Sequence, residues 1–442
     1  MSSQAHHHAA RRAALNQRLP AGLVILPTAR VKSRNADSDY AFRFDSDFFY
    51  LTGFHEPEAV LVQVLGDAPK SILFCQPKNE LREIWEGFLY GPDAAREQFG
   101  FDEAYAIDQL DSKLVELIAG QPRLYYPIGF DERWDRRIQG VIEQVKQRAR
   151  TGKPAPIEFV DVRHAIGELR LIKDDAEKAS MREAGRISAE AHIRAMRLAR
   201  PGQFEYEVEA ELHYHFTKSG SRSPAYGSIV ASGANATCLH YHENNRQMQA
   251  GDLLLIDAGC ELHGYAADIT RTFPVGGRFS GPQKDIYELV LASMHASFDK
   301  VRAGEVRIGY HDAAVRVLTQ GLVDLDILKG EVDGLIEREA YKQFYMHGTG
   351  HWLGLDVHDA GEYKIDGVSR KLEAGMVLTV EPGLYFRPLL ADSPAHYVAV
   401  PEHFLHIGVR IEDDLLVTAD GHENLTALVP KDVAGIEALT VG

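Results

Sequence analysis

LLLIDAGCELHGYAADITRTF, residues 253–273, is the stretch that decides the fold of the second half of the chain. Two apolar runs flank residues 261–264, which end in glycine, so the stretch predicts a β-hairpin. A turn at these four residues places Asp257 directly opposite Asp268, and opposed residues of an antiparallel pair share a face, with Cβ atoms roughly 4.5–5.5 Å apart. The hairpin therefore presents two carboxylates at a spacing that suits a pair of metal ions. Two unrelated aspartates on a solvated hairpin are the alternative.

A later stretch repeats this pattern. AGMVLTVEPG, residues 374–383, aligns with AGDLLLIDAG, residues 250–259, and an acid occupies the same place in both. Each copy is followed by a strand that carries a second acid. The acids are Asp257 and Asp268 in the first copy, and Glu381 and Glu412 in the second. We infer a pseudo-two-fold domain in which each half donates two carboxylates. Chance similarity between two apolar strands is the alternative.

A histidine joins these acids as a candidate metal ligand. His351 lies in MHGTGHWLGLDVHD, residues 346–359. Burying four carboxylates together is prohibitive unless cations neutralise them, and two divalent cations balance four negative charges. The five residues therefore predict a hydrolytic site with two divalent metal ions. Four of the five ligands are hard oxygen donors, which favours Mn²⁺, with Zn²⁺, Co²⁺ and Fe²⁺ as alternatives.

Bulk properties restrict the class of protein. A chain of 442 residues is too long for one typical core and suggests two or three domains. The net charge of −16 argues against nucleic acid or an anionic membrane as a partner, and there is no apolar run of about 18 residues. The N-terminus does not have the pattern of a secretory signal. Cys75, Cys238 and Cys260 show no framework spacing, which predicts a reducing, cytoplasmic location.

The order of elements predicts an α/β (α+β) protein with two domains. Up to about Ile172 the chain has the pattern of an α/β unit, and a long helix then starts near Asp174. We expect an N-terminal α/β domain at residues 1–172 and a catalytic domain at residues 173–442. The expected strands are 23–26, 59–65, 71–75, 124–126, 228–232, 253–260, 265–273, 376–386 and 408–418. The expected helices are 109–119, 131–148, 205–219, 282–303 and 309–322.

Several motifs together resemble those of the Xaa-Pro aminopeptidases (aminopeptidase P), in the pita-bread metallopeptidase family. The motifs are HGTGHWLGLDVHD (347–359), TVEPGLY (379–385), IDAGCELHGYAADITRTFPV (256–275), GVRIEDD (408–414) and ADSDYAFRFDSDFFYLTGFHEPEAV (36–60). The resemblance extends over nearly the whole chain. It implies a creatinase-like N-terminal domain, non-catalytic and concerned with substrate access or oligomerisation, followed by a pseudo-two-fold pita-bread catalytic domain.

The resemblance also implies a role for each metal ligand. Asp257 would hold one ion, Asp268 and Glu412 would bridge both ions, and His351 with Glu381 would complete the other. A hydroxide that bridges the metals would attack the substrate, with Glu381 acting as general base and acid.

Further histidines and one arginine are candidate catalytic residues. By resemblance, His240, His347 and His358 would line the substrate site and bind the scissile carbonyl; taken singly, each would more often be structural. His242 is expected to be structural. Arg410 precedes Glu412 by two residues, so on a strand both share a face and Arg410 could orient Glu412. A surface ion pair is the alternative for Arg410.

A few residues outside the ligand set have weaker assignments. By resemblance, Asp37 and Tyr226 belong to the hydrogen-bond network of the site. Trp85 could approach an active site, although a core or interface position is expected. His6-His7-His8 is expected to be an unstructured tail rather than a metal site.

The expected function is release of the N-terminal residue from peptides that have proline in the second position. An Xaa-Pro dipeptidase (prolidase) shares the ligands and is the main alternative. A non-enzymatic pita-bread binding module is a remote one, because such relatives typically lose ligands. The resemblance also suggests a homo-oligomer, either a dimer or a tetramer.

Overall fold

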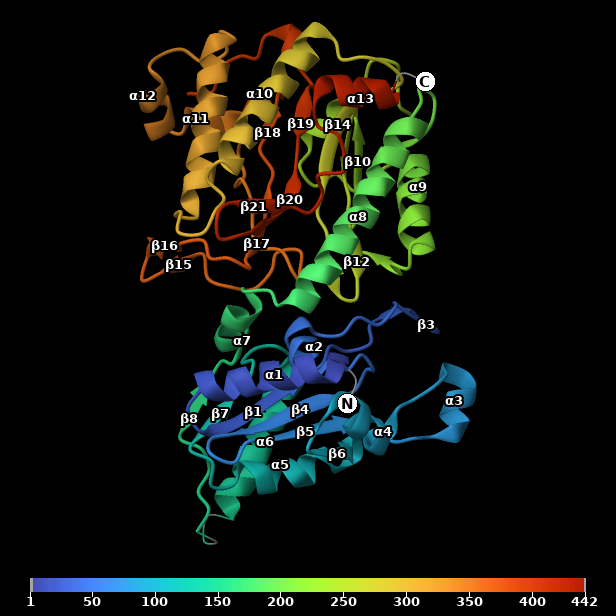
Figure 1. The fold of residues 1–442 in the computed structure, drawn as a ribbon, viewed down its shortest axis with the longest axis vertical. Coiled ribbons are helices and arrows are strands. Elements are labelled where there is room, and N and C mark those ends of the chain that lie inside the picture. The colour runs from blue at the N-terminus through green and yellow to red at the C-terminus, as the bar shows by residue number, and fades with distance from the viewer. Residues whose placement is uncertain (1–2, 149, 151, 441–442) are drawn as a thin grey trace. The chain divides into compact units, whose positions relative to one another are not determined.

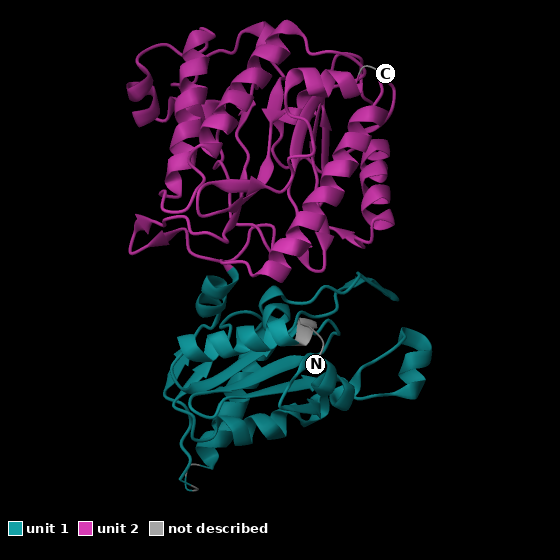
Figure 2. Ribbon diagram, viewed as in Figure 1, with its two compact units in different colours: residues 1–170 teal, residues 171–442 magenta. Residues whose placement is uncertain are grey.

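The structure is a computed structural model that describes residues 3–148, 150 and 152–440. The chain forms two compact units, coloured separately in Figure 2: unit 1 spans Met1–Arg170 and unit 2 spans Leu171–Gly442. Each unit has its own buried apolar core.

Unit 1 is built on a six-stranded mixed sheet in the order β6-β5-β4-β1-β7-β8. The strands are β1 (Gly22–Pro27), β4 (Val60–Leu65), β5 (Lys70–Cys75), β6 (Glu103–Ala106), β7 (Arg123–Tyr125) and β8 (Glu158–Val160). β4 runs antiparallel to both neighbours, and the remaining pairs are parallel. Every residue of β1 is buried, as in a strand covered on both faces. The sequence predicts β1, β4, β5 and β7 but misses the short edge strands.

Helices cover both faces of this sheet (Figure 1). α5 (Leu110–Ile118) and α6 (Glu132–Gln147), both predicted, contribute Leu114 and Val141 to the apolar core that they share with the strands. Asp131 caps α6, because its carboxylate accepts a hydrogen bond from the backbone N–H of Arg133.

The N-terminal helix α1 (Ser3–Arg18) shows that the predicted unstructured tail is wrong, because His6, His7 and His8 lie within it. His8 Nδ1 donates a hydrogen bond to the carbonyl of Tyr50 (3.0 Å), and Arg12 Nη1 donates to that of Leu51 (2.8 Å). Both carbonyls belong to the last turn of α2 (Ser46–Thr52), where helical carbonyls have no partner within the helix. α1 is therefore ordered because its side chains satisfy the end of α2.

The short helix α3 (Glu80–Glu86) projects from unit 1 (Figure 1). Its residue Trp85 is 88% exposed, and Leu81, Ile84 and Phe88 are also exposed. Trp85 is therefore not a core residue of unit 1.

Unit 2 packs long helices against several short antiparallel sheets around one apolar core (Figure 1). The helices are α8 (Asp175–Leu198), α9 (Glu205–Lys218), α10 (Gly281–Phe298), α11 (Ile308–Asp324), α12 (Val332–Glu337) and α13 (Val433–Thr440). The main sheets have the orders β10-β11-β14 and β17-β20-β21, and β18 pairs with β19. Their strands are β10 (Ile229–Ser232), β11 (Leu253–Asp257), β14 (Thr270–Pro274), β17 (Val377–Val380), β18 (Gly383–Tyr385), β19 (Gly408–Arg410), β20 (Asp413–Val417) and β21 (His422–Asn424).

The four long strands predicted in unit 2 are each broken in two. One break separates β11 from β12 (Cys260–Leu262), and a second separates β13 (Tyr265–Ala266) from β14. The other two separate β17 from β18 and β19 from β20. Each break contains or adjoins one candidate carboxylate ligand: Asp257, Asp268, Glu381 and Glu412.

The predicted register of the first hairpin is wrong by two residues. Leu262 pairs with Tyr265, so the turn consists of His263 and Gly264 alone, and both have positive φ (53° and 86°). Two left-handed residues form the tight hairpin turn whose twist matches that of the strands. As a result Asp257 lies opposite Thr270 rather than opposite Asp268. A shift of two residues keeps the side chains on the same face, so both aspartates still face one site.

Candidate metal centre

One pocket of unit 2, with a volume of about 750 Å³, is lined by all nine candidate metal ligands and catalytic residues. Its lining includes the candidate metal ligands Asp257, Asp268, His351, Glu381 and Glu412. It also includes the candidate catalytic residues His240, His347, His358 and Arg410. Ile229, Leu239 and Val357 add apolar wall.

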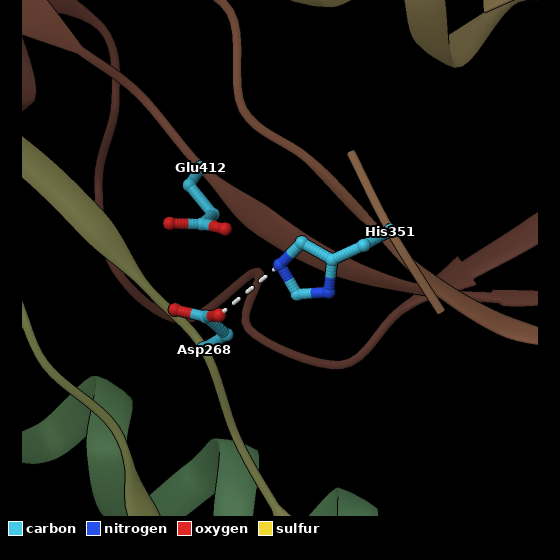
Figure 3. Close-up of side chains that lie close together, drawn as sticks. All are labelled: Asp268, His351 and Glu412. Carbon is cyan, nitrogen blue, oxygen red and sulfur yellow. Dashed lines mark ion pairs between the residues drawn. The ribbon is translucent and has the colours of Figure 1, made fainter. Parts of the chain in front are cut away.

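Three of the five candidate ligands converge on one point (Figure 3). One ligand atom from each of Asp268, His351 and Glu412 lies within 4.8 Å of the other two. His351 Nε2 is 3.6 Å from Asp268 Oδ2 and 3.5 Å from Glu381 Oε1. Imidazole nitrogen and carboxylate oxygen at these separations are suitable donors for a shared divalent cation.

Thr379 of β17 fixes the position of His351 relative to Glu381. Its backbone N–H donates to the His351 carbonyl (2.9 Å), and its hydroxyl accepts a hydrogen bond from the His351 N–H (3.1 Å). The same hydroxyl donates to Glu381 Oε1 (3.2 Å). The histidine segment therefore runs beside β17 in a fixed register, which holds the imidazole against the glutamate.

The tautomer of His351 is set by a backbone carbonyl. His351 Nδ1 lies 2.9 Å from the carbonyl oxygen of Trp352, and because a carbonyl only accepts, Nδ1 carries the proton. Nε2, which faces Asp268 and Glu381, is then left with its lone pair. A hydrogen bond at the remote nitrogen that frees the other for a metal is the usual arrangement of a metal-binding histidine. Burial also lowers the pKa of His351 to about 4, which keeps the ring neutral.

The carboxyl groups of the site need a cation to ionise together. Burial raises the pKa of Asp268 and of Glu412 well above the usual carboxyl range, and repulsion between neighbouring carboxylates adds to the effect. Burial raises the pKa of Glu381 to about 7. Since the ionised forms repel one another in a buried space, positive charge placed among them is strongly favoured. The residues therefore fit a divalent metal.

Asp257 is held differently from the other acids. Arg410 Nη2 donates to Asp257 Oδ2 (2.6 Å), and the Tyr226 hydroxyl lies 2.6 Å from Asp257 Oδ1 and 2.5 Å from Asp268 Oδ1. Arg410 was expected to orient Glu412, but its carboxylate partner is Asp257. Glu412 instead accepts a hydrogen bond from the Thr270 hydroxyl (2.6 Å). Arg410 reaches Glu412 only indirectly, because its Nε donates to the same Thr270 hydroxyl (3.2 Å).

The three predicted catalytic histidines are in two different states. Among the described residues, no ring nitrogen of His240 or His358 has a hydrogen-bond partner, and the two side chains are exposed to the pocket. Both ring nitrogens of His347 are occupied: Nδ1 donates to the Gly348 carbonyl (2.7 Å), and Nε2 accepts from the Tyr385 hydroxyl (2.9 Å). In this state His240 and His358, rather than His347, have nitrogens available to a substrate.

The roles of two residues at or beside the pocket are missed by the sequence analysis. His242, expected to be structural, lines the pocket and is exposed. Tyr385 is buried and links Arg410 Nη1, from which it accepts (2.9 Å), to His347. The sequence places Tyr385 inside a buried strand, where an aromatic residue indicates core packing. Tyr226, expected in the network, does bridge two of the acids.

Asp37 lies in unit 1, where it is exposed in the turn between β2 (Ser33–Asn35) and β3 (Ser38–Asp39). Its backbone N–H is 3.3 Å from Asn35 Oδ1. Its expected place in the network of the site stays a prediction.

Comparison with known proteins identifies the class. Residues 179–419 match metallopeptidase family M24, and residues 8–125 match the aminopeptidase P N-terminal domain. The chain therefore belongs to metallopeptidase family M24, and its fold is the pita-bread catalytic domain preceded by an aminopeptidase P N-terminal domain.

Similarity to individual relatives covers both units. The chain is 46% identical to the Xaa-Pro aminopeptidase of Escherichia coli, over 98% of this chain and 96% of that protein. It superposes with a TM-score of 0.94 on Pseudomonas aeruginosa aminopeptidase PepP, at 50% identity, covering 99% of this chain and 98% of that one. It matches zinc-substituted E. coli aminopeptidase P in complex with product with the same TM-score, at 45% identity, covering 99% and 98% of the two chains.

In the described part of the chain, no helix combines the length and apolar character needed to span a bilayer.

Proposed function

We propose that this protein is an Xaa-Pro aminopeptidase, which releases the first residue of peptides whose second residue is proline. The observation that carries the proposal is the pocket in unit 2, which all nine candidate metal ligands and catalytic residues line. Similarity over both units to enzymes named Xaa-Pro aminopeptidase supports the same conclusion.

The proposed cofactor is a pair of divalent metal ions, with Mn²⁺ favoured by the oxygen-rich donor set. Asp257, Asp268, His351, Glu381 and Glu412, which line one pocket, would hold them. When bound, such ions polarise a carbonyl and lower the pKa of coordinated water.

Glu381 is the proposed proton carrier. Its side chain lines the pocket, where its Oε1 lies 3.5 Å from His351 Nε2 and its Oε2 lies 3.8 Å from His347 Nδ1. It takes a proton from the attacking water and delivers it to the departing proline nitrogen. Because the scissile bond is a tertiary amide, this nitrogen carries no proton of its own before cleavage.

His240 and His358 are proposed to bind the carbonyl oxygen of the scissile bond. Within the described part of the chain, each has a ring nitrogen without a hydrogen-bond partner, and each lines the pocket beside the ligands. A donor positioned where negative charge develops stabilises the transition state. His351 and His358 lie in edge-to-face contact with ring centroids 4.2 Å apart, so His358 is next to the metal site.

Unit 1 is proposed to serve substrate access or assembly into a homo-oligomer. The exposed apolar residues of α3, including Trp85 and Ile84, support a role in subunit contact. We also propose a cytoplasmic location, which the three free cysteines support.

A peptide panel tests the function. The purified protein, loaded with Mn²⁺, is incubated with Xaa-Pro-Yaa tripeptides, longer peptides, Xaa-Pro dipeptides, Xaa-Ala-Yaa controls and N-acetylated forms, and mass spectrometry identifies the products. We expect cleavage between Xaa and Pro in peptides of three or more residues, with loss on acetylation and on replacement of proline. Cleavage confined to dipeptides would indicate a prolidase, and no cleavage at all would indicate a binding module.

Elemental analysis of the same Mn²⁺-loaded protein tests the metal count. We expect two ions per chain, because four clustered carboxylates require that much positive charge. Full activity at well below one ion per chain would refute the two-metal site.

A further inference from the structure

A buried carboxylate outside the metal centre organises the segment that carries His240. Glu205, the first residue of α9, is 0% exposed. Its Oε1 accepts hydrogen bonds from the N–H and the hydroxyl of Ser232, both at 2.7 Å. Its Oε2 accepts from the Tyr241 hydroxyl (2.8 Å) and from the N–H of Arg246 (2.9 Å). Several donors compensate this buried carboxylate, and all of them belong to residues 232–246.

The segment is thereby fixed at both ends and near its middle. Ser232 ends β10, Arg246 returns the chain towards β11, and Tyr241 lies between them. The Arg246 side chain also joins the two ends of the segment directly, because its Nη1 donates to the Ser232 hydroxyl (2.7 Å).

Tyr241 separates two pocket residues and points the opposite way. His240 and His242 are exposed and line the pocket, whereas Tyr241 is buried. The Tyr241 ring belongs to a small apolar cluster with Ile229, Ala231, Ala236, Leu255 and Tyr385. His240 lies in a turn, and its ring stacks on that of His242 with the two centroids 6.4 Å apart, so the two imidazoles lie on the same side of the chain. The anchor on Tyr241 therefore determines the direction in which both histidines face.

We propose that Glu205 and Tyr241 are positioning residues that set the place of the His240 imidazole in the pocket. Glu205 binds the Tyr241 hydroxyl, this bond and the apolar cluster fix the Tyr241 ring, and the backbone then presents His240 to the substrate. The inference rests on the proposed function, since it assigns His240 to substrate binding.

Tyr241→Phe is the main test, because it removes only one hydroxyl and leaves the ring in its apolar cluster. We expect kcat on an Xaa-Pro-Yaa peptide to fall by about 10-fold to 100-fold, because even a small displacement of a catalytic group from its optimum position slows the reaction by this much. Metal content should not change, since neither residue is a candidate ligand. Tyr287→Phe is the matched control: it removes another buried hydroxyl of unit 2, bound to the Lys431 carbonyl (2.8 Å), and should leave kcat unchanged.

The decisive measurement is the double variant. In a His240→Ala background, Tyr241→Phe should lower kcat no further, because the effect of Tyr241 passes through His240. Losses that multiply in the double variant would overturn the proposal and show a general structural role. Glu205→Gln should behave like Tyr241→Phe if it folds, as circular dichroism would show; if it does not fold, the Tyr241 cycle alone decides.

The unaltered protein separates this inference from the proposed function. If it does not cleave Xaa-Pro peptides, the proposed function fails. If it cleaves them and Tyr241→Phe has normal kcat, only the positioning role fails.

Discussion

The strand pair β11–β14 in the first half of unit 2 and the pair β17–β20 in the second half are the two copies of the repeat seen in the sequence. Ile256 pairs with Arg271 in the first, and Val380, at the equivalent place, pairs with Asp413 in the second. A glycine with positive φ precedes each strand: Gly251 at 88° and Gly375 at 98°. The two halves therefore share both a strand register and the turn that leads into it.

The side chains at equivalent places differ in charge. By this register Arg271 corresponds to Asp413, Thr270 to Glu412, and Asp268 to Arg410. Arg271 Nη2 and Asp413 Oδ1 form an ion pair at 2.6 Å in which both side chains are fully buried. Thr270 donates to Glu412, its own counterpart. Equivalent residues thus meet where the halves join.

This comparison explains why the halves cannot be identical. Equivalent positions contact one another across the junction, so an exact repeat would place two arginines or two aspartates together without compensation. Because the two halves differ at these places, the junction holds a buried ion pair between arginine and aspartate. For the same reason, the halves present different side chains to the pocket.

Asp268→Ala should have the largest effect. This position holds a carboxylate in one half and the cation Arg410 in the other, so its removal tests how much the asymmetry matters. We expect turnover of Xaa-Pro peptides to disappear, with the fold retained, because less carboxylate repulsion offsets part of the lost metal stabilisation. Circular dichroism, kinetics and metal content measure these effects, with the exposed Asp420→Ala as control. Normal turnover at normal metal content would rule out a bridging role for Asp268.

His240→Ala and His358→Ala come next. One histidine follows β10 in the first half and the other follows His351 in the second, and neither has a protein hydrogen bond among the described residues. Each variant should lose about 10²–10³ in kcat, the usual effect of removing one preorganised donor. Metal content should stay near that of the unaltered protein. A metal-free variant would instead identify that histidine as a ligand.

Substitutions at two arginines of the junction should affect different properties: one lowers activity, and the other lowers stability. Arg410→Lys should lower kcat/KM by about 10-fold to 100-fold, because an ammonium group does not reproduce the simultaneous contacts to Asp257 and Tyr385. Arg271→Lys should instead destabilise the fold by about 2–3 kcal/mol, since the buried guanidinium also donates to the Glu412 carbonyl (2.6 Å) and the Val429 carbonyl (3.1 Å). Urea unfolding and steady-state kinetics measure the two effects. If the two variants showed the same loss of kcat/KM and the same loss of unfolding free energy, the two arginines would not have these separate roles.

The sequence predicts the candidate ligands because each acid ends an apolar run or stands beside one. It does not predict the strand breaks at Asp257 and Glu381, since an interruption of two residues leaves hydrophobic periodicity almost unchanged. The register of the first hairpin depends on the conformation of His263, for which a left-handed φ is uncommon. The pairing of Arg410 with Asp257 joins residues 153 positions apart, and no local pattern specifies such a contact.

The smallest expected effect concerns Gly251 and Gly375, the glycines that precede the first strand of each repeat. Their alanine variants should lose different amounts of unfolding free energy. Alanine at a left-handed position costs roughly 1–2 kcal/mol. At Gly251 a Cβ atom would meet nothing within 4 Å, so Gly251→Ala should lose only this amount. At Gly375 the added Cβ would lie 2.9 Å from Ile172 Cγ2, so overlap should raise the loss to about 2–4 kcal/mol.

Thermal or urea unfolding of both variants measures the difference. Gly309→Ala, in the first turn of α11, is the control, because its φ is not positive and its Cβ would also meet nothing within 4 Å. It should be neutral or slightly stabilising. If Gly251→Ala and Gly375→Ala lost the same unfolding free energy, overlap with Ile172 would contribute nothing. No loss in either would mean that the left-handed turn is not a constraint shared by the two halves.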